Sequence, residues 1–171
     1  MTPFRFLAAC AVLLLAGCKN NDIPEEIASV FVEAPPSVGG SMKQEVTLPV
    51  SQLKISVITR ALVAAEGILN TAPITSGEPD LRQEFLLVQL DRKAAADVMN
   101  YTKEAMGRHF ILVVNDAAVG IMPIDGQITD GNLMFHVEKK GLTNTQAVMD
   151  LSRRLNISAL KLRKIKESER P

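Results

Sequence analysis

Hydrophobic and polar residues alternate between residues 45 and 58, where the sequence reads EVTLPVSQLKISVI. An alternation with a period of two is typical of half-buried β-strands. Pro49 has no amide proton to donate, so it is expected at the edge of a sheet. The pattern predicts two short edge strands, and their apolar side chains are those of Val46, Leu48, Val50, Leu53, Ile55 and Val57.

The segment 83–107 has the pattern of a strand followed by a helix. The run FLLV inside residues 83–90 is continuously apolar, which favours a central strand covered on both faces. Asp91 is suited to cap a helix, because its carboxylate can accept from amides of the first turn. Apolar residues then recur at helical spacing, and Gly107 is suited to end that helix.

A hairpin is predicted after this helix. Residues 110–114 form an apolar run, and the pair Asn115-Asp116 tolerates the left-handed backbone of a tight turn. The chain is expected to return over residues 119–124. Residues 132–137 (NLMFHV) predict one further strand.

The last part of the chain predicts a helix and a closing strand. Thr143 and Gln146 have the spacing of a capping box. Apolar residues at helical spacing follow until Leu155, and apolar and basic residues alternate over 158–165. The resulting order of elements predicts an α+β fold, namely a ferredoxin-like βαββαβ sandwich with additional N-terminal edge strands and both helices on one face.

Residues 18–44 are interpreted as a linker, since Pro24, Pro35, Pro36, Gly39 and Gly40 interrupt regular structure. Ile23, Ile27, Val30 and Phe31 within it allow one short amphipathic helical turn. Residues 60–74 are ambiguous, with a helical face that Gly67 and Pro73 interrupt, and 75–80 predict a loop. The expected organisation is a signal peptide at 1–17, a lipidated linker at 18–44, an α+β domain at 45–167 and a tail at 168–171.

The first residues, MTPFRFLAACAVLLLAGC, have the pattern of a bacterial lipoprotein signal. Arg5 precedes an apolar segment that is too short for a stable membrane span, and LAGC resembles a lipobox. Cleavage would leave Cys18 as the lipidated N-terminus, and several acyl chains on one residue would hold the protein on a membrane. Lys19 follows Cys18. In lipoproteins of enterobacterial type, an aspartate at this position resembles an inner-membrane retention signal, so its absence favours the outer membrane.

Composition narrows the range of functions. The chain has 19 basic and 19 acidic residues, and this balance argues against a nucleic-acid partner. It has no Trp and one Tyr, so a stacking platform for carbohydrates or bases is not expected. A single Cys would remain after cleavage, which excludes a disulfide within the chain.

The stretch from Leu53 to Ile165 resembles the head of the first periplasmic domain of the protein-export subunit SecD. The residues that carry this resemblance are Leu90-Asp91, Tyr101-Thr102, Gly107-Arg108, Phe110–Asp116, Pro123, Ile128–Gly131 and Thr143–Leu155. The resemblance implies an α+β head that contacts an emerging polypeptide. The transmembrane helices and the proton-coupling acidic residue of SecD have no counterpart in this sequence, so no translocase motor is expected.

Few residues favour catalysis. His109 and His136 are the only histidines, and two such ligands do not make a metal site. Asp116, Asp125 and Asp130 could act as acid, base or calcium ligands, but aspartate is also the usual residue at such turns. The sequence therefore predicts no catalytic residue, no metal and no cofactor.

Three functions remain open at this stage. The favoured one is a binding module that contacts envelope proteins or exported polypeptide through the predicted edge strands. The alternatives are a structural envelope lipoprotein and a hydrolase that uses the loop aspartates. A basic surface formed by Arg153, Arg154, Lys161, Arg163, Lys164 and Lys166 could also face anionic lipid, although a solvated face is the simpler interpretation.

Overall fold

A computed structural model describes residues 23–78 and 82–168. The strands are β1 (Ala28–Val32), β2 (Lys43–Thr47), β3 (Lys54–Ile58), β4 (Ile68–Ser76), β5 (Gln83–Leu90), β6 (His109–Val114), β7 (Ala117–Pro123) and β8 (Asn132–Val137). The helices are α1 (Arg92–Thr102) and α2 (Asn144–Ser168), with short 3₁₀ turns at Gly40–Met42 and Ala65–Gly67. The predicted α+β class is confirmed.

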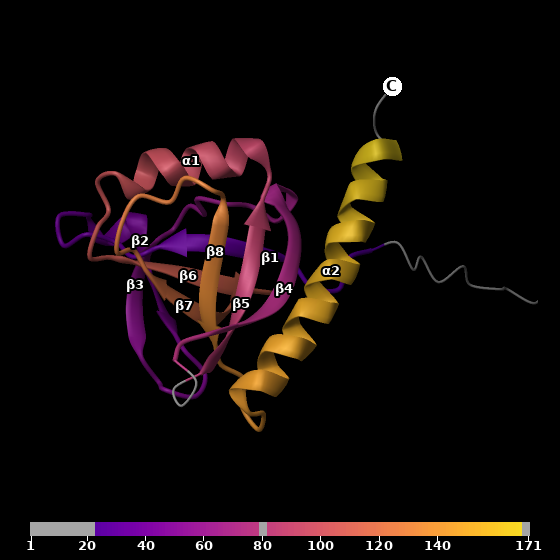
Figure 1. The fold of residues 1–171 in the computed structure, drawn as a ribbon. Coiled ribbons are helices and arrows are strands. Elements are labelled where there is room, and N and C mark those ends of the chain that lie inside the picture. Colours follow the sequence, from indigo (N-terminus) through magenta and orange to yellow (C-terminus); the bar gives the residue numbers. More distant parts are fainter. Residues whose placement is uncertain (1–22, 79–81, 169–171) are drawn as a thin grey trace, which may run out of the picture.

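Six strands form one antiparallel sheet in the order β1-β6-β7-β8-β5-β4, and β2 and β3 form a separate hairpin. The sheet curls strongly, so that β5 and β8 cross in front of β1, β6 and β7 (Figure 1). α1 lies over one end of the curled sheet, α2 runs along one side, and the hairpin lies on the side away from α2 (Figure 1).

The alternation of side chains along β6 separates two hydrophobic clusters. Phe110 and Leu112 point into the main core, which both helices border. Ile111 and Val113 point to the opposite face, where they pack against the β2–β3 hairpin. The curled sheet is therefore covered by helices on one face and by the hairpin on part of the other, as period-two alternation requires.

The predicted caps and turns around α1 and the β6–β7 hairpin are present. The Asp91 carboxylate accepts a 2.7 Å hydrogen bond from the Ala94 amide at the start of α1. Asn115 and Asp116 have φ angles of 47° and 64°, which is the left-handed pair of a tight hairpin turn. These elements follow local rules of sequence, and that is why the pattern located them.

The predicted closing strand at 158–165 is wrong, because α2 continues through this segment to Ser168. No Gly or Pro interrupts the sequence between residues 144 and 168. Leu151, Leu155 and Ala159 are buried at four-residue spacing, so the helical face continues past the predicted break. The fold is therefore a curled α+β sheet that lacks the last strand of a ferredoxin-like sandwich.

The linker interpretation of 18–44 is also corrected, because the described part of this segment contains β1. Ala28, Val30 and Val32 are buried in the main core, and β1 pairs with β6 along its whole length. Burial of this alternating set offsets the cost of ordering the segment. The domain thus begins well before residue 45. The sequence of residues 60–74 allowed a helical face. In the structure this segment contains the 3₁₀ turn Ala65–Gly67 and most of β4.

Candidate binding surface

The two predicted edge strands pair with each other. β2 and β3 form an antiparallel hairpin in which Val46 lies opposite Ile55. Leu48, Ile55 and Val57 are buried against the six-stranded sheet, and Val46 is half-buried beside them. Val50 and Leu53 lie in the exposed turn outside the strands, together with Pro49, which was expected within an edge strand.

The turn of this hairpin is fixed to the end of β8. The Glu138 carboxylate accepts hydrogen bonds of 2.9 Å from the amides of both Val50 and Ser51. Partial burial raises the pKa of Glu138, but the hydrogen bonds from Ser51 and Val50 outweigh this and hold its pKa below the usual range. The hairpin is thus held at its turn as well as by its apolar face.

Three strand edges are covered by other segments. The Val30 amide of β1 donates to the Val63 carbonyl at 2.8 Å, and the Ala34 amide donates to the Ser56 carbonyl of β3 at 2.8 Å. On β4, Asn156 of α2 accepts from the Thr71 amide at 2.7 Å and donates to the Thr71 carbonyl at 2.8 Å. Such covering prevents unwanted pairing at the edges of a sheet.

The outer edge of β2 is different. The bonds Leu48 N–H to Leu53 O and Thr59 N–H to Met42 O show that the even-numbered residues of β2 face β3. Backbone groups of successive strand residues point to opposite edges. The amides and carbonyls of Lys43, Glu45 and Thr47 therefore point away from β3. The Lys43 amide donates to the Gly40 carbonyl, and the other five groups have no backbone partner within 23–78 and 82–168.

An apolar sheet surface lies next to this open edge. The hairpin contacts β1 and β7, and the next strands in the sheet are β8 and β5. On the hairpin side of these strands lie Phe85, Leu87 and Met134; the first two are half-buried and Met134 is 44% exposed. We call these three residues the outer face. A strand added beside β2 would extend the hairpin layer across it.

A cavity of about 340 Å³ lies on the other side of the hairpin turn, between the start of β7, the end of β8 and α2. Its floor is formed by the buried side chains of Val114, Ala118, Val137, Ala147 and Leu151. Its remaining lining residues are Glu26, Pro49, Ala117, Val119, Lys139, Lys140 and Arg154.

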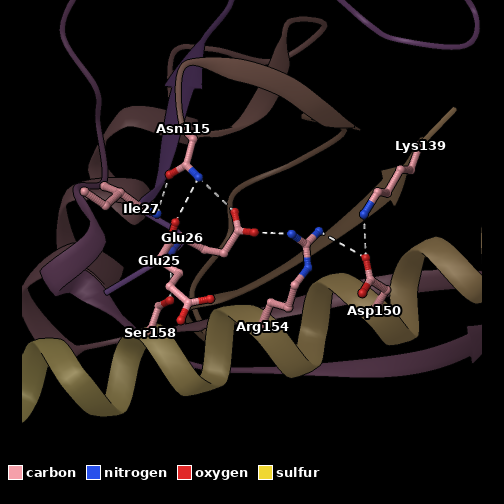
Figure 2. A network of polar contacts seen from close by, with 8 residues as sticks. All are labelled: Glu25, Glu26, Ile27, Asn115, Lys139, Asp150, Arg154 and Ser158. Atoms are coloured by element: carbon pink, nitrogen blue, oxygen red, sulfur yellow. Dashed lines mark hydrogen bonds and ion pairs between the residues drawn. The ribbon is translucent and has the colours of Figure 1, made fainter. Parts of the chain in front are cut away.

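A polar network beside the cavity joins α2 to the residues before β1 (Figure 2). Arg154 pairs with Glu26 and with Asp150, the latter at 3.0 Å, and Lys139 pairs with Asp150 at 2.7 Å. The hydrogen bond from Lys139, assisted by Arg154, holds the pKa of the Asp150 carboxyl below its usual range. The network fixes the path by which the chain enters the domain.

Asn115 contributes the other half of this attachment. Its side chain accepts from the Ile27 amide at 2.9 Å and donates to the Glu25 carbonyl at 3.0 Å, as Figure 2 shows. The Asn115-Asp116 turn, which was predicted from its tolerance of left-handed backbone, therefore also anchors the segment before β1. The sequence contains no signal for this contact, because the partners are separated by almost ninety positions.

The histidines and loop aspartates are distributed over separate structural contacts. His109 Nδ1 lies 2.6 Å from Glu33 Oε2, and His136 lies edge-on to Phe85 with ring centroids 6.4 Å apart. Asp130 accepts from the side chain and amide of Asn132, and the side-chain bond, followed by the amide bond, lowers its pKa. The described ranges contain no group of three His, Cys, Asp or Glu residues able to hold a metal ion.

No protein-family model matches the sequence, and no curated protein matches it. Solved structures do match. One, described as "Structure and function of a membrane component SecDF that enhances protein export", superposes with a TM-score of 0.51 at 8% identity, over 77% of this chain and 62% of its own. Most of the chain therefore shares its fold with part of SecDF.

A second match, described as "Crystal structure of SecDF in Super-membrane-facing form", has a TM-score of 0.52 and 10% identity. It covers 77% of this chain and 18% of the SecDF chain. This protein therefore spans less than two thirds of either SecDF chain, and at such low identity the likeness concerns the fold alone. No helix within residues 23–78 or 82–168 is long and apolar enough to cross a membrane. Cys18 and the predicted signal peptide lie outside these residues.

Proposed function

We propose that the protein is a lipid-anchored, periplasm-facing lipoprotein of the bacterial envelope, and that its SecD-head-like domain binds an extended segment of another protein along the open edge of β2. The observation that carries the proposal is the contrast between edges. Other segments bond to β1, β3 and β4, whereas the Lys43 carbonyl and the amides and carbonyls of Glu45 and Thr47 are unpaired in the described structure.

The chemistry of an open edge suits an extended polypeptide. A peptide strand can pair with the Lys43 carbonyl and with the backbone of Glu45 and Thr47, which provides affinity with little dependence on sequence. Its inward side chains would pack on the outer face. The hairpin needs little reorganisation for such binding, since its turn is fixed by Glu138 and its apolar face is buried.

The partner is proposed to be an exported polypeptide or another envelope protein. SecDF is described as a membrane component that enhances protein export, and the shared fold favours a role for this domain near exported chains. Catalysis and proton-driven movement are not part of the proposal. A hydrolase based on the loop aspartates gains no support, since Asp130 bonds to Asn132 two residues away, as turn aspartates do.

The membrane anchor is proposed from the sequence of the first 18 residues. Replacing Cys18 with Ser should release the protein from membranes during fractionation, because acylation needs the thiol. Tight membrane association of the Cys18→Ser variant would contradict the anchor. Comparison of inner- and outer-membrane fractions of the native protein tests the preference for the outer membrane.

The edge is tested with a pair of variants at one position. Glu45→Pro removes an outward amide without removing a hydrogen bond to β3, whereas Glu45→Ala removes only the side chain and its ion pair with Lys54. The probe is a synthetic peptide of alternating valine and threonine. The account expects lost binding for Glu45→Pro and retained binding for Glu45→Ala. Equal binding by the two variants would contradict it.

A further inference from the structure

The cavity beside α2 differs in chemistry from the open edge. Its lining contains eight apolar residues and no Ser, Thr, Asn, Gln, Tyr or His; the other residues are the carboxylate of Glu26 and three cations, Lys139, Lys140 and Arg154. A peptide would bring amide groups into it, and few side chains there could satisfy them. An aliphatic chain has no such need.

The charges at the cavity favour an anion. Lys139 and Arg154 share Asp150, and Arg154 also pairs with Glu26. Lys140 has no ion pair in the described part of the chain, and it is exposed at the lining. The Nε atom of Arg154 is buried without a hydrogen-bond partner. Lys140 can therefore receive an anionic acceptor, and Arg154 adds positive charge beside it.

Small side chains in the lining explain why the cavity stays open. Ala117, Ala118 and Ala147 come from two elements that meet here, and each ends at a methyl group. Val137 and Leu151 are buried around them, so the space is bounded by packed side chains. Its volume of about 340 Å³ falls in the range of small-molecule sites, which are mostly apolar with a few convergent polar groups.

We infer that this cavity binds the aliphatic chain of an anionic amphiphile, with its carboxylate or phosphate beside Lys140 and Arg154. The inference goes beyond the proposed function and does not depend on it. A long-chain carboxylate and a lysophospholipid present the same combination of one apolar chain and one anionic group. Both burial of the chain and pairing of the headgroup contribute to binding.

The experiment measures binding of decanoate to the purified soluble domain by calorimetry, with decyltrimethylammonium as the probe of opposite charge. Hexanoate tests chain length, and lysophosphatidylglycerol tests the phosphate source. We expect decanoate to bind, and the cationic and shorter probes to bind at least about tenfold more weakly. Equal binding of decanoate and the cationic probe would overturn the inference. The absence of binding by both decanoate and lysophosphatidylglycerol would also overturn it.

Variants separate the cavity from other surfaces. Lys140→Glu should weaken decanoate binding, whereas Lys164→Glu, an exposed change on α2 away from the lining residues, should not. Ala117→Leu fills the cavity from its exposed side and should weaken the longer probe more than hexanoate. Unchanged binding in both Lys140→Glu and Ala117→Leu would place the amphiphile elsewhere and overturn the inference. Peptide binding at β2 should be unaffected by either variant.

Discussion

Asn156 of α2 binds both backbone groups of Thr71 in β4, accepting from its amide at 2.7 Å and donating to its carbonyl at 2.8 Å. One side-chain amide thereby takes the place of a neighbouring strand. Arg163 donates to the Leu69 carbonyl on the same edge, and Pro73 has no amide to offer. The extension of α2 past the predicted break is what brings these groups to β4.

Replacement of Asn156 with Ala should lower the free energy of unfolding by about 1–3 kcal/mol, because the Thr71 amide loses its acceptor and the Thr71 carbonyl keeps only its bond from the Ser152 hydroxyl. The matched control is Asn70→Ala. Asn70 bonds to Gln89 on an exposed surface, so its loss should have an effect of less than about 0.5 kcal/mol. Urea unfolding measures both. Equal effects would show that Asn156 does not cover the edge.

Asn115→Gly tests the attachment of the chain before β1. Glycine accepts the φ of 47°, so the turn and the backbone bond from residue 115 to the Ile27 carbonyl are retained, while the side-chain bonds to the Ile27 amide, Glu25 and Glu26 are lost. We expect a loss of about 1–2 kcal/mol and faster amide exchange at Ile27. Asp116→Gly has the same backbone change without these bonds and should be close to neutral. Unchanged exchange at Ile27 in the Asn115→Gly variant would contradict this role.

Acid should release the turn of the β2–β3 hairpin. The pKa of Glu138 is lowered in the folded protein, so its contribution to stability is present above its unfolded pKa and is lost as the pH falls through the lowered value. Protection of the Val50 and Ser51 amides, measured against the intrinsic exchange rate at the same pH, should therefore decrease in acid. In Glu138→Gln this pH dependence should be absent. Asp130 and Asp150 also titrate at lowered pKa, so the difference between the two proteins is the quantity to compare.

Gly131→Ala should be strongly destabilising. Gly131 has a φ of 68°, and an added Cβ would lie 2.8 Å from the Cβ of Ala95 in α1. The left-handed backbone alone costs about 1–2 kcal/mol for a residue with a side chain, and the contact adds to it. Gly126→Ala is the control, since its Cβ would meet nothing within 4 Å. A thermal shift of similar size in both variants would contradict this explanation.

Local rules of sequence predicted α1, the β6–β7 turn and the β2–β3 strands, because a cap, a left-handed pair or an alternating run lies within a few residues. β1 was missed although Ala28, Val30 and Val32 alternate, since prolines on both sides favoured a linker. The absence of Gly and Pro between Asn144 and Ser168 was the available signal for the length of α2. The prediction of a closing strand rested on an alternation that a helix also accommodates.

The candidate sites depend on contacts that sequence patterns do not contain. The alternation of β2 and β3 predicted strands, but the openness of one edge follows from which segments cover the others. The cavity combines residues from the segment before β1, the hairpin turn, β7, β8 and α2. These residues do not form a motif in the sequence. They come together as one apolar, cation-lined cavity only in the folded domain.

The central claim is that the outer edge of β2 pairs with an extended polypeptide. Residue-resolved amide hydrogen exchange with and without the valine–threonine peptide tests it most directly. The account predicts slower exchange at Glu45 and Thr47. Little change is expected at Lys43, whose amide already donates to the Gly40 carbonyl, or at Gln44 and Val46, whose amides already face β3. Protection confined to other edges, or equal protection of Glu45, Thr47 and the even-numbered residues of β2, would contradict the account.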